Sequence, residues 1–471
     1  MEKKNTWETY SSKQLKELEK INAQYRDFLD NGKTERECID TIVNTIEKSG
    51  YRELESLIKE GAALKTGDKV YSVWMNKSIA MFQIGRKPMT DGMNILGAHI
   101  DSPRLDVKQN PLYEDGGFAY LDTHYYGGVK KYQWVTIPLA IHGVIVKKDG
   151  TCVEINIGEN EDDPVFFVSD LLIHLAQEQL EKKAAKVIEG EALDIIVGNK
   201  PLLIDKKDKK KDEKEAGKEA VKAGVLDILK ETYDIHEEDF VSAELEIVPA
   251  GKAREAGFDR SMTLAYGQDD RVCAYTSMQA MLDSDVTDRT MCCILVDKEE
   301  IGSVGATGMQ SHFFENAVAE VMNLAGEYSE LNVRRCLAHS CMLSSDVSSA
   351  FDPTYASSFD KKNVAYLGGG MVINKFTGAR GKSGSNDANA EYLAHLRHIF
   401  DKAEVNFQTA ELGKVDLGGG GTIAYILALY GVNVIDSGVA VLNMHAPWEI
   451  ISKVDLYEAY RGYIAFLKEQ A

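Results

Sequence analysis

The chain has 471 residues, of which 44% are hydrophobic and 27% are charged, and its formal net charge is −20. This length exceeds what one small core needs, so we expect two or three domains. The negative charge argues against nucleic acid or an anionic membrane as a partner, because binding phosphate groups requires a basic face.

The first twenty residues contain no apolar stretch of the kind found in a signal peptide. The sequence also lacks any run of about 18 apolar residues, the length that spans a membrane. Its seven cysteines are scattered without zinc-finger spacing, a pattern typical of reduced thiols. We therefore predict a cytoplasmic, soluble protein with no membrane partner.

The first quarter of the chain predicts helices followed by a strand. Residues 12–60 carry apolar side chains at helical spacing. Residues 94–100 form an apolar run that predicts a buried strand, which ends before Pro103.

The next part of the chain, from 105 to 249, has a different character. Alternating segments such as 140–146 and 151–155 indicate strands of a β-rich unit. Within it, residues 205–219 contain seven lysines and six acids and no apolar core residue. We interpret this charged stretch as a solvated surface insertion.

Strands and helices alternate again after residue 250. We predict strands at 262–266, 291–296, 337–343, 364–366 and 434–442, and helices at 271–282 and 422–430. Such alternation indicates an α/β sheet between two helix layers. The β-rich segment is then a domain inserted between the two halves of the α/β domain.

Two adjacent glutamates, Glu299 and Glu300, follow the apolar run 291–296. Carboxylates beside a buried strand cost free energy unless a cation holds them. In an extended segment neighbouring side chains point to opposite sides, so one glutamate can bind a metal while the other moves a proton. Taken alone, however, the pair is better explained as a solvated charged loop.

Further candidate ligands share this position directly after an apolar run. They are His99 with Asp101, Asp269 with Asp270, Asp346, and His445. Each has a structural explanation when taken singly, such as a turn, a helix N-cap or a core histidine. Because ligands bind beyond the carboxyl ends of strands in open α/β sheets, we expect these side chains to meet at one edge of the sheet. Together they match the ligands of a two-metal site with one bridging carboxylate.

In combination, seven motifs resemble the aspartyl aminopeptidase family of dizinc metallo-aminopeptidases, over nearly the whole chain. The motifs are Gly-Ala-His-Ile-Asp-Ser-Pro at 97–103, Tyr-Gly-Gly at 126–128, Gln-Asp-Asp at 268–270, Asp-Lys-Glu-Glu-Ile-Gly at 297–302, Ser-Asp at 345–346, Gly-Thr-Ile at 421–423 and Asn-Met-His at 443–445. The resemblance implies a three-layer α/β/α catalytic domain of the zinc-exopeptidase type, formed by 1–104 and 250–471. It also implies that 105–249 is a β-rich dimerisation domain, and that dimers build a homo-oligomer, a dodecamer.

The resemblance assigns the metal ligands as follows: His99, Asp269 and Glu300 hold one ion, and Asp269, Asp346 and His445 hold the other. It implies that Glu299 is the general base and that Asp101 is the partner of His99. The implied cofactors are two divalent ions, Zn²⁺ ahead of Co²⁺ or Mn²⁺. A cis peptide bond is implied between Asp269 and Asp270.

The segments expected to contact the substrate match the family less well than the metal-binding motifs do. Residues 172–175 resemble a segment that sends a histidine into the partner subunit's active site, so His174 is a candidate substrate contact. An acidic substrate side chain requires a cation, and Lys375 or Arg380 is suited to this role. The family's Asn-Gln-Arg-Tyr-like segment is replaced here by Phe-Thr-Gly-Ala-Arg-Gly at 376–381.

These patterns predict a metallo-aminopeptidase that hydrolyses the N-terminal residue of peptides with a two-metal-bound water and Glu299 as the base. Its specificity stays open between acidic N-terminal residues and a broader or non-acidic range. Two rival interpretations are an enzyme that removes acyl groups from amino acids and a metal-binding scaffold with secondary activity. A nucleotide-binding enzyme is disfavoured, because neither glycine run, 368–370 or 418–421, precedes a P-loop lysine.

Overall fold

The structure is a computed structural model that describes residues 5–202 and 219–469. The predicted surface insertion at 205–219 lies outside these residues except for Glu219. The chain folds as two compact units. The first comprises Met1–Ser102, Ala253–Met444 and Trp448–Ala471, and the second comprises Pro103–Lys252 and His445–Pro447.

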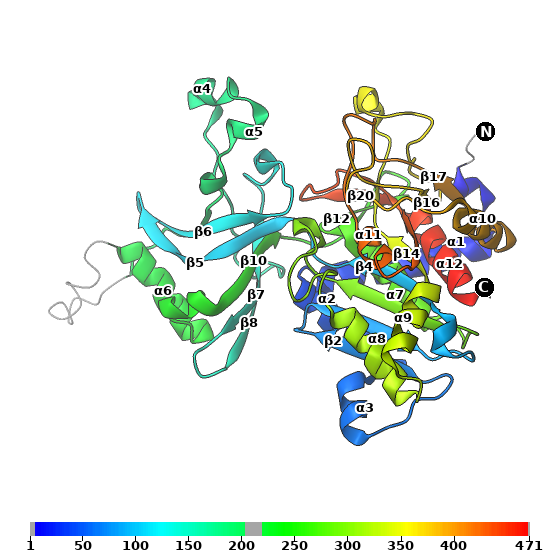
Figure 1. Cartoon of the computed structure of the whole chain (residues 1–471). Coiled ribbons are helices and arrows are strands. Elements are labelled where there is room, and N and C mark those ends of the chain that lie inside the picture. Colours follow the sequence, from blue (N-terminus) through cyan, green and yellow to red (C-terminus); the bar gives the residue numbers. More distant parts are fainter. Residues whose placement is uncertain (1–4, 203–218, 470–471) are drawn as a thin grey trace. The chain divides into compact units, whose positions relative to one another are not determined.

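A nine-stranded sheet forms the centre of the first unit (Figure 1). Its strands, in spatial order, are β1 (Arg52–Glu53), β2 (Lys69–Trp74), β3 (Ser78–Gln83), β13 (Thr290–Val296), β4 (Met93–His99), β14 (Cys341–Ser345), β18 (Asn433–Gly438), β16 (Met371–Asn374) and β17 (Phe407–Thr409). The central strands β13, β4, β14 and β18 are parallel, and β3 and β16 flank them in the antiparallel direction. All residues of β13 and β4 are buried, as expected for strands covered on both faces.

Helices cover both faces of this sheet. Successive side chains of β13 alternate between two core clusters, with Cys293 and Leu295 in one and Cys292 and Ile294 in the other. The first cluster includes residues of α1 (Ser12–Asn31), α2 (Glu35–Lys48), α7 (Gln268–Leu282), α10 (Ala390–Lys402) and α12 (Lys453–Lys468). The second includes residues of α3 (Leu54–Glu60), α8 (Phe313–Leu324), α9 (Glu330–His339) and α11 (Ala424–Ala428). The predicted three-layer α/β/α class is therefore confirmed.

The first unit also contains a five-stranded sheet. Its order is β11 (Arg254–Ala256), β12 (Met262–Ala265), β20 (Glu449–Ser452), β19 (Ala440–Leu442) and β15 (Ser348–Ser349). The prediction of one strand over 434–442 is wrong, because the chain leaves the large sheet after β18 and enters the small one at β19. At the end of β18, a Cβ atom on Gly438 would lie 1.9 Å from the carbonyl oxygen of Asp346, so only glycine fits this crossing.

The second unit is β-rich, as the alternating sequence pattern predicts. Its six-stranded antiparallel sheet has the order β8 (Cys152–Ile157), β7 (Leu139–Val146), β10 (Ala243–Pro249), β5 (Arg104–Asp115), β6 (Phe118–Tyr126) and β9 (Ile195–Gly198). Its helices are α4 (Gln177–Leu180), α5 (Ala184–Val187) and α6 (Ala220–Tyr233). None of the helices in the described parts of the chain has the length and apolarity needed to cross a membrane.

Short 3₁₀ turns connect several of these elements. They are η1 (Thr6–Thr9), η2 (Met89–Asp91), η3 (Lys131–Gln133), η4 (Ile173–Leu175), η5 (Gly190–Ala192), η6 (Glu237–Ser242), η7 (Glu299–Ile301) and η8 (Pro353–Ser358).

Two further predicted strands are wrong. Residues 337–339 end α9, because Val333 and Leu337 are the buried face of a helix, and β14 begins only at Cys341. His339, which lies within the predicted strand 337–343, is exposed. Residues 364–366 form an isolated bridge instead of a strand.

Candidate metal centre

Three candidate segments follow neighbouring parallel strands of the nine-stranded sheet. β4 lies between β13 and β14 and is parallel to both. His99 is the last residue of β4, Glu300 follows β13, and Asp346 follows β14. These three residues share one edge of the sheet, as the carboxyl ends of parallel strands require.

The prediction that every candidate follows a strand of one sheet is wrong for Asp269 and His445. Asp269 follows β12 and His445 follows β19, which both belong to the five-stranded sheet. Strands of three or four residues carry too little pattern to be assigned to a sheet from sequence. The peptide bond between Asp269 and Asp270 is cis, as the resemblance implied.

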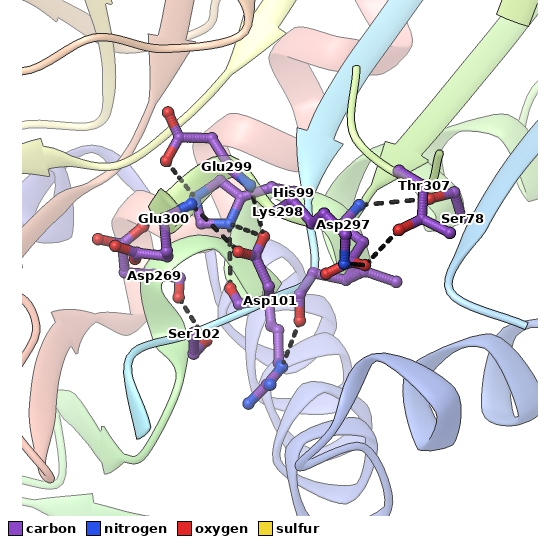
Figure 2. A network of polar contacts seen from close by, with 12 residues as sticks. Ser78, His99, Asp101, Ser102, Asp269, Asp297, Lys298, Glu299, Glu300 and Thr307 are labelled. Carbon is purple, nitrogen blue, oxygen red and sulfur yellow. Dashed lines mark hydrogen bonds and ion pairs between the residues drawn. The ribbon is translucent and has the colours of Figure 1, made fainter. Parts of the chain in front are cut away.

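His99 is buried between two carboxylates (Figure 2). Its Nδ1 lies 3.2 Å from Oδ1 of Asp101, and its Nε2 lies 3.2 Å from Oδ1 of Asp269. Asp101 favours a proton on Nδ1 of His99. The lone pair is then on Nε2, which faces Asp269. This is the tautomer that suits a metal-binding histidine.

Ligand atoms of His99, Asp269 and Asp346 lie within 4.8 Å of one another. A carboxylate oxygen of Glu300 also lies within 4.8 Å of one of Asp269. An imidazole nitrogen with carboxylate oxygens is a donor set that zinc accepts. The grouping differs from the one that the resemblance implied, since Asp346 takes the place of Glu300 beside His99 and Asp269.

Asp101 also holds the backbone of the glutamate pair (Figure 2). The N–H groups of Glu299 and Glu300 donate to Oδ1 and Oδ2 of Asp101, each at 3.1 Å. Asp101 is fully buried. Asp101 therefore orients the ring of His99, since its carbonyl oxygen lies 3.0 Å and its Oδ1 3.2 Å from Nδ1, and its carboxylate also holds the turn that carries both glutamates. The sequence indicated only the first of these roles.

The glutamate pair lies in η7 and not in the extended segment that we predicted. Lys298, which precedes it, has a left-handed backbone with φ of 69°. In a 3₁₀ turn neighbouring side chains diverge by about 120°, so the two glutamates still face different directions. Oε2 of Glu299 lies 4.0 Å from Nε2 of His99, and the side chain of Glu299 is 16% exposed.

The buried acids of this cluster have strongly shifted pKa values. Burial raises the pKa of Asp346 well above its ordinary value, and the charges of Asp270 and Asp269 raise it further. Burial has the same effect on the pKa of Asp270. Burial by itself would lower the pKa of His99, but hydrogen bonds with Asp101 and Asp269 outweigh it and raise that pKa. Carboxylates crowded in this way are favoured in their ionised form when a divalent cation binds among them.

Two of the predicted site histidines belong to the second unit. Nδ1 of His445 lies 2.9 Å from the carbonyl oxygen of Gly128. A proton on this nitrogen gives Nε2 of His445 the lone pair that a metal ligand needs. His174 lies in η4 and its side chain is exposed.

The two cationic candidates for substrate binding lie in the segment after β16. Nζ of Lys375 forms an ion pair with Asp387 at 2.5 Å, and Lys382 pairs with the same carboxylate at 2.9 Å. Arg380 is exposed and has a left-handed backbone. Lys375 is thus already next to an anion of its own chain, which the sequence did not indicate.

Sequence reasoning also missed Asp436, a buried acid in β18. Its Oδ1 accepts a hydrogen bond from Oγ1 of Thr422 at 2.5 Å. Thr422 follows the glycine run and its Oγ1 accepts the N–H of Ala424 at the start of α11. An aspartate inside an apolar strand was the available signal, since such a residue is rarely buried without a partner.

A three-layer α/β/α unit with histidine and carboxylate ligands at the carboxyl ends of its central strands is typical of metal-dependent hydrolases. The family described as aminopeptidase I zinc metalloprotease (M18) matches residues 28–467. The chain is 63% identical over 466 residues to a probable M18 family aminopeptidase 1 of Clostridium acetobutylicum, covering 99% of this chain and 98% of that protein. The chain therefore belongs to the M18 family of zinc aminopeptidases, which confirms the resemblance.

Solved structures agree with this assignment. The crystal structure of aminopeptidase I from Clostridium acetobutylicum has a TM-score of 0.90 with this chain at 60% sequence identity. The crystal structure of an M18 family aminopeptidase from Thermotoga maritima has a TM-score of 0.92 at 44% identity. Both comparisons cover 100% of each chain.

Asp436 provides a test of the electrostatics around the site. Burial raises its pKa to about 7, although the hydrogen bond from Thr422 opposes this shift. Between about pH 4 and pH 7 the folded chain then keeps a proton that the unfolded chain has lost, so this residue's contribution to stability falls as pH rises. We expect Asp436→Asn, which keeps an oxygen for Thr422, to remove that dependence.

The measurement is urea unfolding of both proteins, in chelator, at several pH values. The free energy of unfolding of wild type relative to the variant should decrease from about pH 5 to about pH 7. Parallel curves for the two proteins would show that the Asp436 carboxyl has no raised pKa.

Proposed function

We propose that this chain is a dinuclear aminopeptidase, which hydrolyses the N-terminal residue of peptides with two divalent metal ions. The observation that carries the proposal is the cluster of His99, Asp269 and Asp346, with Glu300 beside Asp269. Membership of a zinc aminopeptidase family supports the choice of zinc over cobalt or manganese.

In this proposal Asp269 is shared between the two ions. His99, Asp269 and Asp346 would hold one ion, and Asp269, Glu300 and His445 would hold the other. When bound there, two such ions would supply Lewis-acid chemistry, which lowers the pKa of a water molecule and polarises the scissile carbonyl group. The fit rests on the donor types and on the buried negative charge that surrounds His99.

Glu299 is the proposed general base. It is outside the proposed ligand set, its backbone is held by Asp101, and its carboxylate is partly exposed near Nε2 of His99. From this position it accepts a proton from the attacking water and later donates it to the leaving amine. Because Glu299 is partly exposed, its proton can reach the substrate. Asp101 is fully buried, and its role is to orient His99 and the glutamate turn.

Substitution of Glu299 separates proton transfer from metal binding. We expect Glu299→Gln to lower kcat by about 10²–10⁴-fold, because the amide cannot accept the proton. Zinc content, measured by elemental analysis, should stay at the wild-type value. Glu330→Gln, at an exposed position in α9, is the control and should leave both quantities unchanged. Turnover of Glu299→Gln close to wild type would exclude Glu299 as the base.

Metal removal tests the proposed class of enzyme. Hydrolysis of aminoacyl-p-nitroanilides should stop after treatment with a chelator and return when zinc, cobalt or manganese is added. Activity that survives complete removal of metal would rule out the proposed function. Zinc binding without hydrolysis of any peptide or anilide would favour the metal-binding scaffold.

The ion pair between Lys375 and Asp387 favours a broad specificity over an acidic one. In our proposal Lys375, Arg380 and His174 are candidate substrate contacts, and Asp387 competes with an acidic substrate for Lys375. We therefore expect Asp387→Asn to raise kcat/KM for Asp and Glu anilides relative to Leu, Lys and Met anilides. An unchanged ratio would remove Lys375 as the contact. Asp360→Asn, at an exposed position whose carboxylate contacts Asn363, is the control.

We also propose that copies of the chain assemble into a dodecamer built from dimers through 105–249. This part of the proposal rests on the family resemblance, and the β-rich second unit is compatible with it.

A further inference from the structure

The backbone of Asp269 is held from two sides by residues that are not proposed ligands. Its N–H donates to Oε2 of Glu449 at 3.0 Å. Its carbonyl oxygen accepts a hydrogen bond from Oγ of Ser102 at 2.7 Å (Figure 2). These two contacts hold the peptide groups on both sides of the Asp269 side chain.

Glu449 is almost completely buried at the start of β20. It pairs with Ala265 in the ladder between β12 and β20. Its carbonyl oxygen also accepts Nε2 of Gln268 at 2.7 Å, so the segment that leads into Asp269 is tied to β20 by main chain and side chain. Burying a carboxylate is costly unless strong donors satisfy it, so a glutamate at this place is not explained by packing.

Ser102 lies on the opposite side of the same peptide. It is fully buried and follows directly after Asp101, the residue that orients His99 and the glutamate turn. Through Ser102 the segment after β4 is joined to Asp269, and through Glu449 the five-stranded sheet is joined to it. Asp269 is thus fixed relative to both sheets that supply the site.

We propose that Glu449 and Ser102 are positioning residues that hold Asp269 in the orientation in which one carboxylate reaches two metal ions. The inference rests on the proposed two-ion site, and it concerns residues outside the proposed ligand set. A bridging carboxylate must suit two ions at once, so a small rotation of its peptide changes both sets of bonds. Loss of residues that orient ligands typically costs 10- to 100-fold in metal affinity, and we expect about this effect here.

Two substitutions of Glu449 separate positioning from packing. Glu449→Gln keeps the volume and an oxygen that accepts the N–H of Asp269, and it should retain most of the zinc affinity. Glu449→Met keeps a similar volume but offers only a weak acceptor, and it should weaken zinc binding by about 10- to 100-fold.

Glu458 in α12 supplies the matched control. It is also fully buried, and its Oε2 accepts the N–H of Asn406 at 2.6 Å, in a segment without proposed ligands. Its Oε1 also accepts hydrogen bonds from Tyr10 and Arg461. Glu458→Met therefore removes a buried acceptor of a backbone N–H, together with these two contacts, at a place away from the proposed ligands. It should lower the temperature of unfolding measured in chelator, with zinc affinity unchanged.

The experiment is competition for zinc between the purified full-length chain and a chromophoric chelator. Should Glu449→Met fail to fold, Ser102→Ala tests the same claim with a smaller change, and it too should weaken zinc binding. Wild-type zinc affinity in the Glu449→Met or Ser102→Ala variant, or an equal loss in Glu458→Met, would overturn the positioning role.

The outcome is separable from that of the proposed function. If wild type binds two zinc ions without hydrolysing peptides, the proposed function fails, yet weaker zinc binding by Glu449→Met still supports positioning. If wild type hydrolyses peptides and Glu449→Met binds zinc normally, only the positioning role fails.

Discussion

The arrangement of the site depends on one buried carboxylate, that of Asp101. It contacts Nδ1 of His99 and accepts the N–H groups of Glu299 and Glu300. Each of these contacts alone is ordinary, but together they fix a proposed ligand, the proposed base and a second proposed ligand relative to one another. Because Asp101 is fully buried, its hydrogen bonds face little competition from water and hold the geometry firmly.

The second constraint is that the site draws on two sheets. Parallel strands β13, β4 and β14 bring Glu300, His99 and Asp346 to one edge, while Asp269 arrives from β12 of the smaller sheet. The hydrogen bonds between the strands of one sheet do not fix the position of the other sheet. Contacts between segments must therefore hold Asp269 in place. The hydrogen bonds from Ser102 and to Glu449 are such contacts, and they hold the backbone of Asp269 against the segments after β4 and at β20.

The strongest parts of the fold could be predicted from sequence because their patterns are local. The apolar runs that became β4 and β13, and the apolar spacing of α1 and α2, are long enough to identify. The five-stranded sheet could not be predicted, since its short strands pair across distant parts of the chain. For the same reason the sequence did not indicate a role for Glu449, which depends on the pairing between β20 and β12. It also did not indicate the ion pair of Asp387 with Lys375, which forms only after folding.

The most direct test of the account is an X-ray anomalous difference map at the zinc edge, from crystals grown with zinc. We predict two peaks that share the carboxylate of Asp269, one also bonded to His99 and Asp346 and the other to Glu300 and His445. A single peak, or two peaks without a carboxylate oxygen of Asp269 in both coordination shells, would contradict the two-ion site.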